Sequence, residues 1–487
     1  MAHMTEHNDL ARRPNIVFIM TDQQRYDTVR AFGYSHVDSP HIDRLAHEGV
    51  WFSHCYVTGA SCVPSRASLF NGLYPHTLGV LDNASTWRHS WVEQLAAAGY
   101  ACASIGKMHT QPMDAPAGFH HRTIVENKDR SMAKRGRDFI DAWDQELQRT
   151  GHVKPGLPTY RNLPDYADRM GAYDWPLPAT LHADAFVGAR AVDWIDNRPD
   201  GAEPFFLQVG FPGPHPPYDP PEEWSAPYLE RELPISGVSA TDLEGQPPPF
   251  VALREKHANG HHDAAPHQIN ASKTLRHRQW AHYLGNVSLI DAQIGDILAR
   301  LEAKGLASNT IVVFTSDHGD CLGDHGHLQK WNFYEQSVRV PLVVWAPGLL
   351  SARGEISALV QSFDIVPALL AMAQVETPAW FETESLLPAL QGQVFAGRSA
   401  VYCEQGRDVV FQFSDFVSMV RTLHFKLVHF LGEEFGQLFD LTLDPQENHN
   451  LWSDVSYRAQ RDELTRCLCD WRLRSAYHTR DWTHCFR

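Results

Sequence analysis

Short runs of consecutive apolar residues recur along the chain, and each has the length of one buried β-strand. Continuous runs of this kind are typical of parallel sheets, whose strands are covered on both faces. Helical patterns lie between them, and the clearest covers residues 275–304, where apolar side chains recur every three or four positions before Gly305. The predicted strands are residues 15–20, 101–105, 205–211, 310–315 and 342–345. Strands alternating with helices predict an α/β fold with a doubly wound, mostly parallel sheet and helices on both faces.

The pattern changes near residue 396. Beyond it, short segments rich in β-branched and aromatic residues predict a small antiparallel sheet, and a helical pattern follows. The three strand-like segments and the helix are residues 409–420, 424–431, 436–441 and 456–474. We therefore expect two domains, residues 1–395 and residues 396–487.

Two further segments have a distinct composition. Residues 243–272 are rich in Pro, His, Gly and Asn, so we expect a long loop there. The end of the chain is rich in aromatic residues, and two interpretations are open: the tail packs on the core of its own chain, or it packs on a second subunit. Because aromatic residues are enriched at protein interfaces, we favour an arm that supports a homo-oligomer, a dimer or a tetramer. The aromatic residues of this tail are Trp471, Tyr477, Trp482 and Phe486.

Four of the predicted strands are followed at once by polar, ionisable residues. In open α/β sheets the carboxyl ends of parallel strands are the place where binding and catalytic sites form. These residues, in chain order, are Asp22 and Gln23, Lys107 and His109, His215, and Asp317 and His318. Four such clusters predict one shared site at this edge of the sheet.

The string CVPSRASLFNG, residues 62–72, is the most specific one in the chain. Pro64 suits a first helical turn and Gly72 suits a helix end, so Cys62 lies just before the predicted helix. Free N–H groups and the helix dipole favour an anion at that position, and Arg66 adds a positive charge. A small buried cysteine beside a helix start is the alternative interpretation.

Composition narrows the class of protein. Of the 487 residues, 43% are hydrophobic and 21% are charged, as in ordinary globular chains. The formal net charge of −16 argues against nucleic acid as a partner, and no apolar run reaches the length of a membrane span. The eight cysteines are sparse, and the polar start, Met1 to Met4, shows no signal-peptide pattern. We therefore expect reduced thiols and a cytoplasmic location.

The string from Cys62 to Gly72 resembles the motif of type I sulfatases, which belong to the alkaline phosphatase superfamily. The resemblance extends to NIVFIMTDQQ near the start, to residues 316–342 and to residues 438–451. It implies an alkaline-phosphatase-like α/β domain followed by a smaller domain with an antiparallel sheet. It also implies that a formylglycine-generating enzyme converts Cys62 to formylglycine. The hydrated aldehyde then carries two hydroxyls, one to attack sulfur and one whose deprotonation expels sulfate.

The resemblance further implies one divalent metal ion. Asp22, Gln23, Asp317 and His318 would hold it together with the modified residue 62. Many family members have Asp and Asn in place of Gln23 and His318 and bind Ca²⁺. An imidazole shifts the preference towards Mn²⁺, so we expect Mn²⁺ or Ca²⁺, with Mn²⁺ favoured. The Gln and His version resembles a branch that includes phosphonate monoester hydrolases.

Catalytic roles are also implied by the resemblance. Lys107 would bridge residue 62 and the sulfate oxygens, and His109 would be the base that deprotonates the hemiacetal, a role that its ordinary pKa suits. His215 and Lys330 would bind sulfate oxygens and assist the leaving oxygen. Arg66 would hold the hydrated aldehyde and balance charge.

The expected activity is therefore hydrolysis of a sulfate monoester, by a sulfuric ester hydrolase, to an alcohol and inorganic sulfate. Phosphonate monoester hydrolases, as the resemblance goes, replace the pair Lys107 and His109 with hydroxyl residues, so sulfate esters are favoured here. Two alternatives stay open at this point. One is a phosphonate monoester or phosphodiester hydrolase using the same site, and the other is an unmodified homologue that binds an anion without catalysis. The alcohol half of the substrate is not specified by the sequence.

Overall fold

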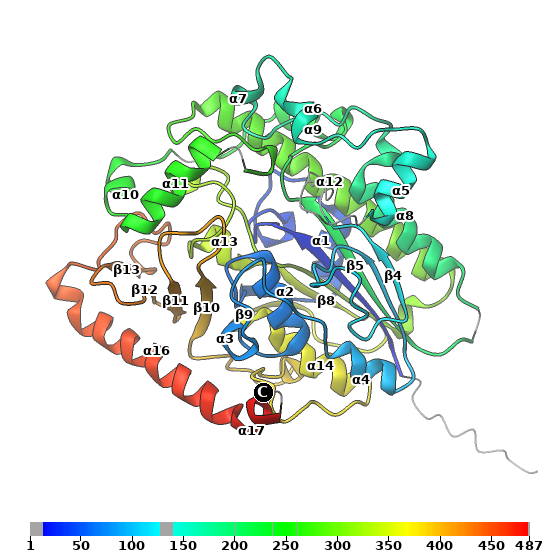
Figure 1. Ribbon diagram of the computed structural model, residues 1–487. Helices are drawn as coiled ribbons and strands as arrows, with labels where there is room; N and C mark the ends of the chain where they lie inside the picture. The colour runs from blue at the N-terminus through cyan, green and yellow to red at the C-terminus, as the bar shows by residue number, and fades with distance from the viewer. Residues whose placement is uncertain (1–12, 127–139, 200, 236, 261, 486–487) are drawn as a thin grey trace, which may run out of the picture.

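The computed structural model describes residues 13–126, 140–199, 201–235, 237–260 and 262–485. Most of them form one large sheet with helices on both faces, and a smaller sheet lies beside it (Figure 1). The polar start at Met1 to Met4, used above for the location, lies outside the described residues.

The large sheet has nine strands, and its central strands are parallel. The order is β4-β3-β5-β1-β6-β8-β2-β7, with β9 paired to β2. Pairs β3–β4, β3–β5, β1–β5, β1–β6 and β2–β9 are parallel, whereas β6–β8, β2–β8 and β2–β7 are antiparallel. The strands are β1 Asn15–Asp22, β2 Val50–Tyr56, β3 Ala101–Gly106, β4 His121–Ile124, β5 Phe205–Pro214, β6 Thr310–Ser316, β7 Arg339–Val340, β8 Leu342–Trp345 and β9 Gly354–Gln361. All five predicted strands are confirmed.

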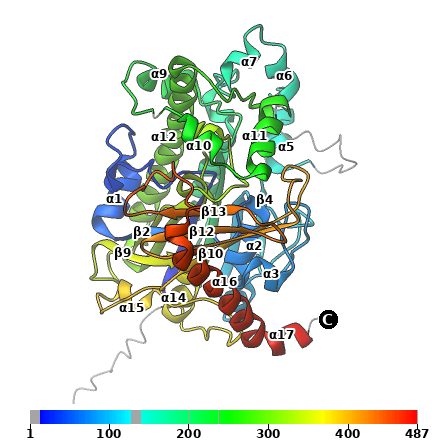
Figure 2. The same cartoon turned by 90° about the vertical axis from the view of Figure 1, so that its left-hand side faces the viewer.

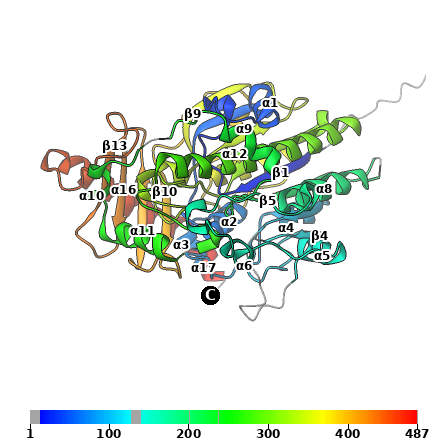
Figure 3. The same cartoon turned by 90° about the horizontal axis from the view of Figure 1, so that it is seen from above.

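Alternate residues of β1 face two separate cores. Ile16 and Phe18 lie in one core with residues of α2, α4 and α14, while Val17 and Ile19 lie in the other with residues of α1, α8 and α12. The predicted helix at 275–304 is α12, and helices cover both faces as expected (Figure 3). The bounds are α1 Pro40–Glu48, α2 Cys62–Asn71, α4 Val92–Ala97, α8 Ala183–Asp196, α12 Lys273–Ala303 and α14 Ile365–Met372.

Further helices lie in the connections between strands, and one of them, α9, packs on α12 (Figure 1). Their bounds are α3 Pro75–Leu78, α5 Ala142–Arg149, α6 Leu157–Arg161, α7 Tyr166–Arg169, α9 Glu222–Leu229, α10 Ala240–Glu244, α11 Pro248–Gly260, α13 Glu335–Val338 and α15 Leu387–Leu390.

The expectation of a long loop at residues 243–272 is wrong. The segment contains the 13-residue helix α11, which buries Phe250 and Leu253, and a short 3-10 turn at His262–Ala264. Three of its prolines, residues 247–249, lie at the start of the helix, where a missing N–H group costs little. Because the segment is rich in His and Asn and has few buried apolar positions, its sequence shows no clear helical pattern.

The second sheet is antiparallel, as predicted, and has the order β10-β11-β12-β13. Its first strand, β10, was not predicted, and residues 407–415, within or beside the predicted strand 409–420, form a loop instead. Helix α16 packs on this sheet, and α17 follows it (Figure 2). The bounds are β10 Val401–Gly406, β11 Phe416–Arg421, β12 Phe425–Phe430, β13 Gly436–Asp440, α16 Arg458–His478 and α17 Arg480–Cys485.

The interpretation of the aromatic tail as an oligomer arm fails for Trp471. Its indole is buried in its own chain, stacked on Tyr402 at 4.3 Å between ring centroids and edge-on to Tyr74 at 4.8 Å. Tyr477 is exposed, and Phe486 lies outside the described residues.

Seven described cysteines are free thiols. Within the described residues, every helix is too short or too polar to cross a membrane.

Candidate active site

Helix α2 presents Cys62 at the edge of the large sheet. Cys62 is the first residue of the helix, with Ser61 as its N-cap, rather than the residue before the helix as the sequence suggested. The helix is buried from Cys62 to Phe70 and ends where Gly72 adopts a left-handed φ of 67°. Because so much of α2 is buried, Cys62 is held firmly by its surroundings.

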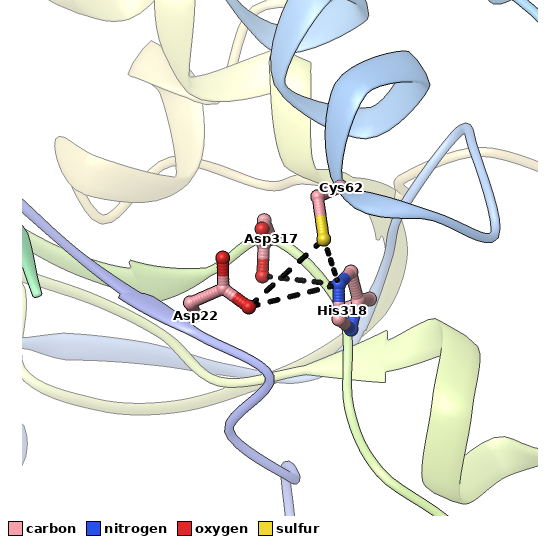
Figure 4. A group of neighbouring side chains, drawn as sticks. All are labelled: Asp22, Cys62, Asp317 and His318. Atoms are coloured by element: carbon pink, nitrogen blue, oxygen red, sulfur yellow. Dashed lines mark hydrogen bonds and ion pairs between the residues drawn. The ribbon is translucent and has the colours of Figure 1, made fainter. Parts of the chain in front are cut away.

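Three side chains from the ends of β1 and β6 surround the sulfur atom (Figure 4). The two strands are adjacent and parallel, so Asp22 and Asp317 leave the sheet side by side. The ligand atoms of Asp22, Cys62, Asp317 and His318 all lie within 4.8 Å of one another, and all four residues are buried. Two carboxylates, an imidazole and a sulfur so close together form a set of atoms suited to a divalent cation.

Hydrogen bonds fix the orientation of the imidazole of His318. Its Nδ1 lies 2.9 Å from the carbonyl oxygen of Gly319, an atom that only accepts, so Nδ1 carries the proton. The Nε2 atom therefore faces the group and lies 3.1 Å from the sulfur of Cys62. An imidazole anchored through its other nitrogen is the usual arrangement of a metal ligand.

Two buried cations neutralise the carboxylates. Arg66 donates from Nε to Asp317 Oδ2 at 2.7 Å and from Nη2 to Asp22 Oδ2 at 3.2 Å. Lys107 Nζ lies 2.5 Å from the same oxygen of Asp22. Burial by itself would raise the pKa of Asp22, but Lys107, His215 and Arg66 together hold that pKa well below its usual value. Asp22 is therefore a carboxylate at neutral pH.

Gln23 connects this group to Lys330. Its Oε1 accepts from Lys330 Nζ at 2.7 Å, and its Nε2 donates to Asp320 Oδ2 at 2.6 Å. The backbone N–H of Gln23 donates to Asp317 Oδ1 at 3.0 Å. Asp320 thus orients the amide of Gln23, and the amide oxygen faces the ammonium of Lys330.

The remaining histidines approach from β5 and from the segment after β3. His215 donates from Nδ1 to the carbonyl of Pro216 at 2.8 Å, and its Nε2 lies 3.5 Å from Asp263 Oδ2. Burial and the neighbouring Lys330 lower the pKa of His215 well below its usual value. The backbone N–H of His109 donates to Glu126 at 3.3 Å.

One cavity of about 790 Å³ opens onto these groups. Its inner end carries the sulfur atom and the positively charged or imidazole side chains. Its outer part is formed by other segments, including residues 82–84 and residues 407–412. The inner side chains are Cys62, Lys107, His109, His215 and Lys330.

The structure brings the sequence-predicted site residues together. Each lies in the group of Figure 4, contacts that group, or lines the cavity. The sequence analysis missed Asp263, Asp320 and Asp408. Asp320 stands in the polar stretch after β6, a signal that was visible but received no role. Asp263 and Asp408 lie in loops with no signal of their own.

A family model described as Sulfatase matches residues 14–375, which is well over half of the chain. The chain belongs to the sulfatase family. A second model, described as N-sulphoglucosamine sulphohydrolase, C-terminal, matches residues 323–474 of this sulfatase. Membership of the sulfatase family agrees with the resemblance seen in the motif at Cys62. The enzyme is therefore a sulfuric ester hydrolase.

Similar proteins share almost the whole length of this sulfatase. An arylsulfatase of Clostridium perfringens is 30% identical, with 94% of each chain covered. An N-acetylglucosamine-6-O-sulfatase of Bacteroides thetaiotaomicron is 26% identical, with 94% of this chain and 86% of the relative covered. The crystal structure of a phosphonate monoester hydrolase of Agrobacterium radiobacter superposes with a TM-score of 0.80 at 25% identity, covering 95% and 96% of the two chains. The fold is thus the alkaline-phosphatase-like fold that the sequence predicts.

Proposed function

We propose that this sulfatase hydrolyses a sulfate monoester through formylglycine at position 62 and one divalent metal ion. The observation that carries the proposal is the position of Cys62. Its sulfur lies beside two carboxylates and an imidazole on one side, and the cavity opens onto it on the other. A nucleophile between a cation site and a cavity lined with Lys and His side chains suits attack on an anionic ester.

The donor set fits a divalent ion. Asp22 and Asp317 offer carboxylate oxygens, and His318 offers a lone pair at Nε2 because its Nδ1 donates to Gly319. A bound divalent ion would polarise the sulfate oxygens and stabilise the negative charge that develops during the reaction. Gln23 is the further ligand that we propose. Mixed oxygen and nitrogen ligands favour Mn²⁺ over Ca²⁺.

Formylglycine would supply two hydroxyl groups on one carbon, one for attack at sulfur and one whose deprotonation releases sulfate. The maturation partner would be a formylglycine-generating enzyme. Arg66, which contacts both Asp22 and Asp317, would hold the hydrated residue and keep the buried charges balanced.

The cavity side chains divide the remaining work. Lys107 and Lys330 would bind the sulfate oxygens, since both ammonium groups lie at the inner end of the cavity. His109 would take the proton from the second hydroxyl of residue 62, and His215 would assist the leaving oxygen. The hydrogen bond from Nδ1 to the carbonyl of Pro216 fixes the orientation of the His215 imidazole. Side chains that are already held in position lower the barrier because they do not reorganise during the reaction.

Mass spectrometry of the peptide that contains Cys62 tests the nucleophile. Conversion to the aldehyde lowers the mass by about 18 Da, and a hydrazide label marks the aldehyde independently. We expect the converted protein to hydrolyse 4-nitrophenyl sulfate and the Cys62→Ala variant to lose that activity. Full activity of Cys62→Ala, or an unmodified and active thiol protein, would refute the proposal. An unmodified and inactive protein from a converting host would favour an anion-binding homologue instead.

A second candidate function is hydrolysis of phosphonate monoesters at the same site. The likeness to the phosphonate monoester hydrolase of Agrobacterium radiobacter favours it. Lys107 and His109 in the cavity favour the sulfate ester. The ratio of kcat/KM for 4-nitrophenyl sulfate and 4-nitrophenyl phenylphosphonate decides between the two, because it compares the two transition states directly.

We also propose that the protein is cytoplasmic and that it forms a homo-oligomer. We further propose a boundary between two domains near residue 396. The seven free cysteines support the location. The exposed Leu473 and Tyr477 on α16 support an interface between copies of the chain. The start of the second sheet at Val401–Gly406 supports the boundary. Sedimentation of the purified protein tests the oligomeric state.

A further inference from the structure

Strand β10 attaches the second sheet to the chain just before Cys62. Glu404 exchanges backbone hydrogen bonds with this segment: its N–H donates to Thr58 at 2.9 Å, and its carbonyl accepts from Ala60 at 3.1 Å. At the end of β10, Gly406 donates to the carbonyl of Leu81 at 2.9 Å. The residues that follow β10 therefore leave the sheet beside the nucleophile helix, at the mouth of the cavity.

Residues 407–410 and 412 line the cavity, and we name the segment 407–412 the outer wall. The carboxylate of Asp408 shapes it by accepting from the N–H groups of Val410 at 2.7 Å and Phe411 at 2.6 Å. The N–H of Asp408 itself donates to the carbonyl of Phe411 at 2.8 Å. A turn closed by its own aspartate in this way is a defined structure rather than a loose connection.

One hydrogen bond connects the outer wall to the catalytic segment. The indole Nε1 of Trp331 donates to Asp408 Oδ2 at 2.9 Å. Trp331 directly follows Lys330 and has a left-handed φ of 71°, a conformation that costs free energy in a bulky residue. Its backbone N–H donates to Ala60 at 3.1 Å. Asp408 and Ala60 thus hold Trp331, and both Asp408 and Trp331 line the cavity.

The outer wall presents apolar surface to the cavity. Val409 lines the cavity and leaves 68% of its surface exposed, and Val410 and Ala84 line the cavity as well. Polar members of the wall also line the cavity: Asp408, Gln412 and Arg407, which pairs with Asp415 at 2.7 Å. An exposed valine on a built turn offers contact area to an apolar group, whereas the inner end offers charge to the sulfate.

We propose that residues 407–412 contact the alcohol half of the substrate and select an alcohol with an apolar body, and that Asp408 is a positioning residue that orders this wall through Trp331. This inference rests on the proposed sulfatase function. It assigns the two ends of one cavity to the two halves of the ester, with sulfate at the inner end and alcohol against Val409.

Val409→Ala tests the contact, and Val394→Ala is its matched control. Val394 is fully exposed and does not line the cavity, so the two variants remove the same atoms from the surface. Each buried methylene contributes up to about fourfold to binding, so loss of two partly covered methyl groups should raise KM by about 3- to 10-fold. We expect that rise for 4-nitrophenyl sulfate in Val409→Ala, with kcat unchanged within about twofold, as loss of uniform binding requires.

Two further ligands separate the ends of the cavity. We expect KM for ethyl sulfate, whose short alcohol does not reach Val409, to change by less than about twofold in Val409→Ala. The inhibition constant of inorganic sulfate, which occupies the inner end alone, should not change. Equal KM values for 4-nitrophenyl sulfate in Val409→Ala and Val394→Ala would overturn the proposal. So would an equal effect on all three ligands.

Asp408→Asn and Trp331→Phe test the positioning role. In Asp408→Asn, the side-chain oxygen still accepts from the N–H groups of Val410 and Phe411. The amide nitrogen then faces the indole N–H of Trp331, and because both are donors, the hydrogen bond to Trp331 is lost. We expect each single variant to raise KM for 4-nitrophenyl sulfate by about 5- to 20-fold, the effect of losing one hydrogen bond of about 1–2 kcal/mol. The double variant should show no further rise, because both remove the same bond. Additive effects, or weaker inhibition by inorganic sulfate, would overturn the role.

Failure of this inference differs visibly from failure of the proposed function. If the converted wild-type protein hydrolyses no sulfate ester, the proposed function is wrong, and the outer wall has no substrate to select. If it hydrolyses 4-nitrophenyl sulfate and Val409→Ala behaves like Val394→Ala, only the role of the outer wall is wrong. A melting temperature measured for each variant shows that folding is intact before the kinetics are compared.

Discussion

The guanidinium of Arg66 is the group whose removal tests the charge balance of the site. It lies 2.7 Å from Asp317 and 3.2 Å from Asp22, and none of the three side chains is exposed to solvent. With an effective dielectric constant of about 20, charges at such distances attract by roughly 5 kcal/mol per pair. Desolvation offsets much of that attraction, but removing one partner leaves buried charge uncompensated and costs about 3–5 kcal/mol. We expect Arg66→Met to lower the free energy of unfolding by that amount.

The same two carboxylates are the groups that we propose as metal ligands, so the loss should depend on the metal. A divalent cation bound to Asp22 and Asp317 supplies the positive charge that the methionine lacks. For a chain of 487 residues the entropy of unfolding is roughly 1 kcal/mol per kelvin, so 3–5 kcal/mol corresponds to about 3–5 °C in melting temperature. We expect this drop after treatment with EDTA and a clearly smaller one with saturating Mn²⁺.

Arg398→Met is the matched control. Arg398 forms a buried two-point pair with Asp364 at 2.6 and 2.7 Å, and neither residue lines the cavity. Its removal should cost a similar free energy of unfolding, by an amount that EDTA and Mn²⁺ leave unchanged. The reasoning is refuted if Arg66→Met melts like the wild type in EDTA. It is refuted equally if both variants respond to Mn²⁺ in the same way.

Two further predictions concern stability. Burial raises the pKa of Asp291 to about 7, above roughly 4 in the unfolded chain, so its contribution to stability is complete below pH 4 and is lost as pH rises towards 7. The free energy of unfolding, measured in urea, should fall between pH 5 and pH 8, and this fall should be smaller in Asp291→Asn by up to about 3 kcal/mol. Gly106→Ala should cost about 3 kcal/mol or more, because a Cβ there meets the carbonyl oxygen of Gly210. Gly151→Ala, where the backbone is also left-handed but the space is open, should cost about 1 kcal/mol, and equal melting temperatures for the two would contradict this account.

The sequence predicts the strands of the large sheet that are buried on both faces, but it does not predict those with one partly exposed face. The strand β1 is buried at every position, so it is a continuous apolar run in the sequence. By contrast, the first half of β9 alternates between partly buried and exposed positions, and β2 includes Ser53 and His54. Alternation over so few residues is a weak signal beside helical patterns. Both strands belong to the sheet because they pair with each other and because β2 also pairs with β8, and these contacts join segments that are far apart in the sequence.

The inner end of the cavity was predictable because a general rule of α/β sheets places it. Asp22 and Asp317 follow adjacent parallel strands, so their convergence needs only the sheet order. Asp263 could not be found in this way. It reaches His215 from the turn between α11 and α12, and its left-handed φ of 51° depends on contacts that no short sequence pattern encodes.

The outer wall shows most clearly where local reasoning ends. Residues 407–412 reach the cavity because β10 pairs with the segment before Cys62, across more than 300 positions in sequence, and β10 itself was missed in the sequence. The two ends of the cavity therefore have separate origins in the chain. The sulfate end depends on α2 and on strand ends of the large sheet, whereas the alcohol end depends on a connection of the second sheet that donates no catalytic side chain and accepts a hydrogen bond from Trp331. Because few contacts couple the two ends, substitutions in residues 407–412 should change which alcohol is accepted while leaving the sulfate chemistry intact.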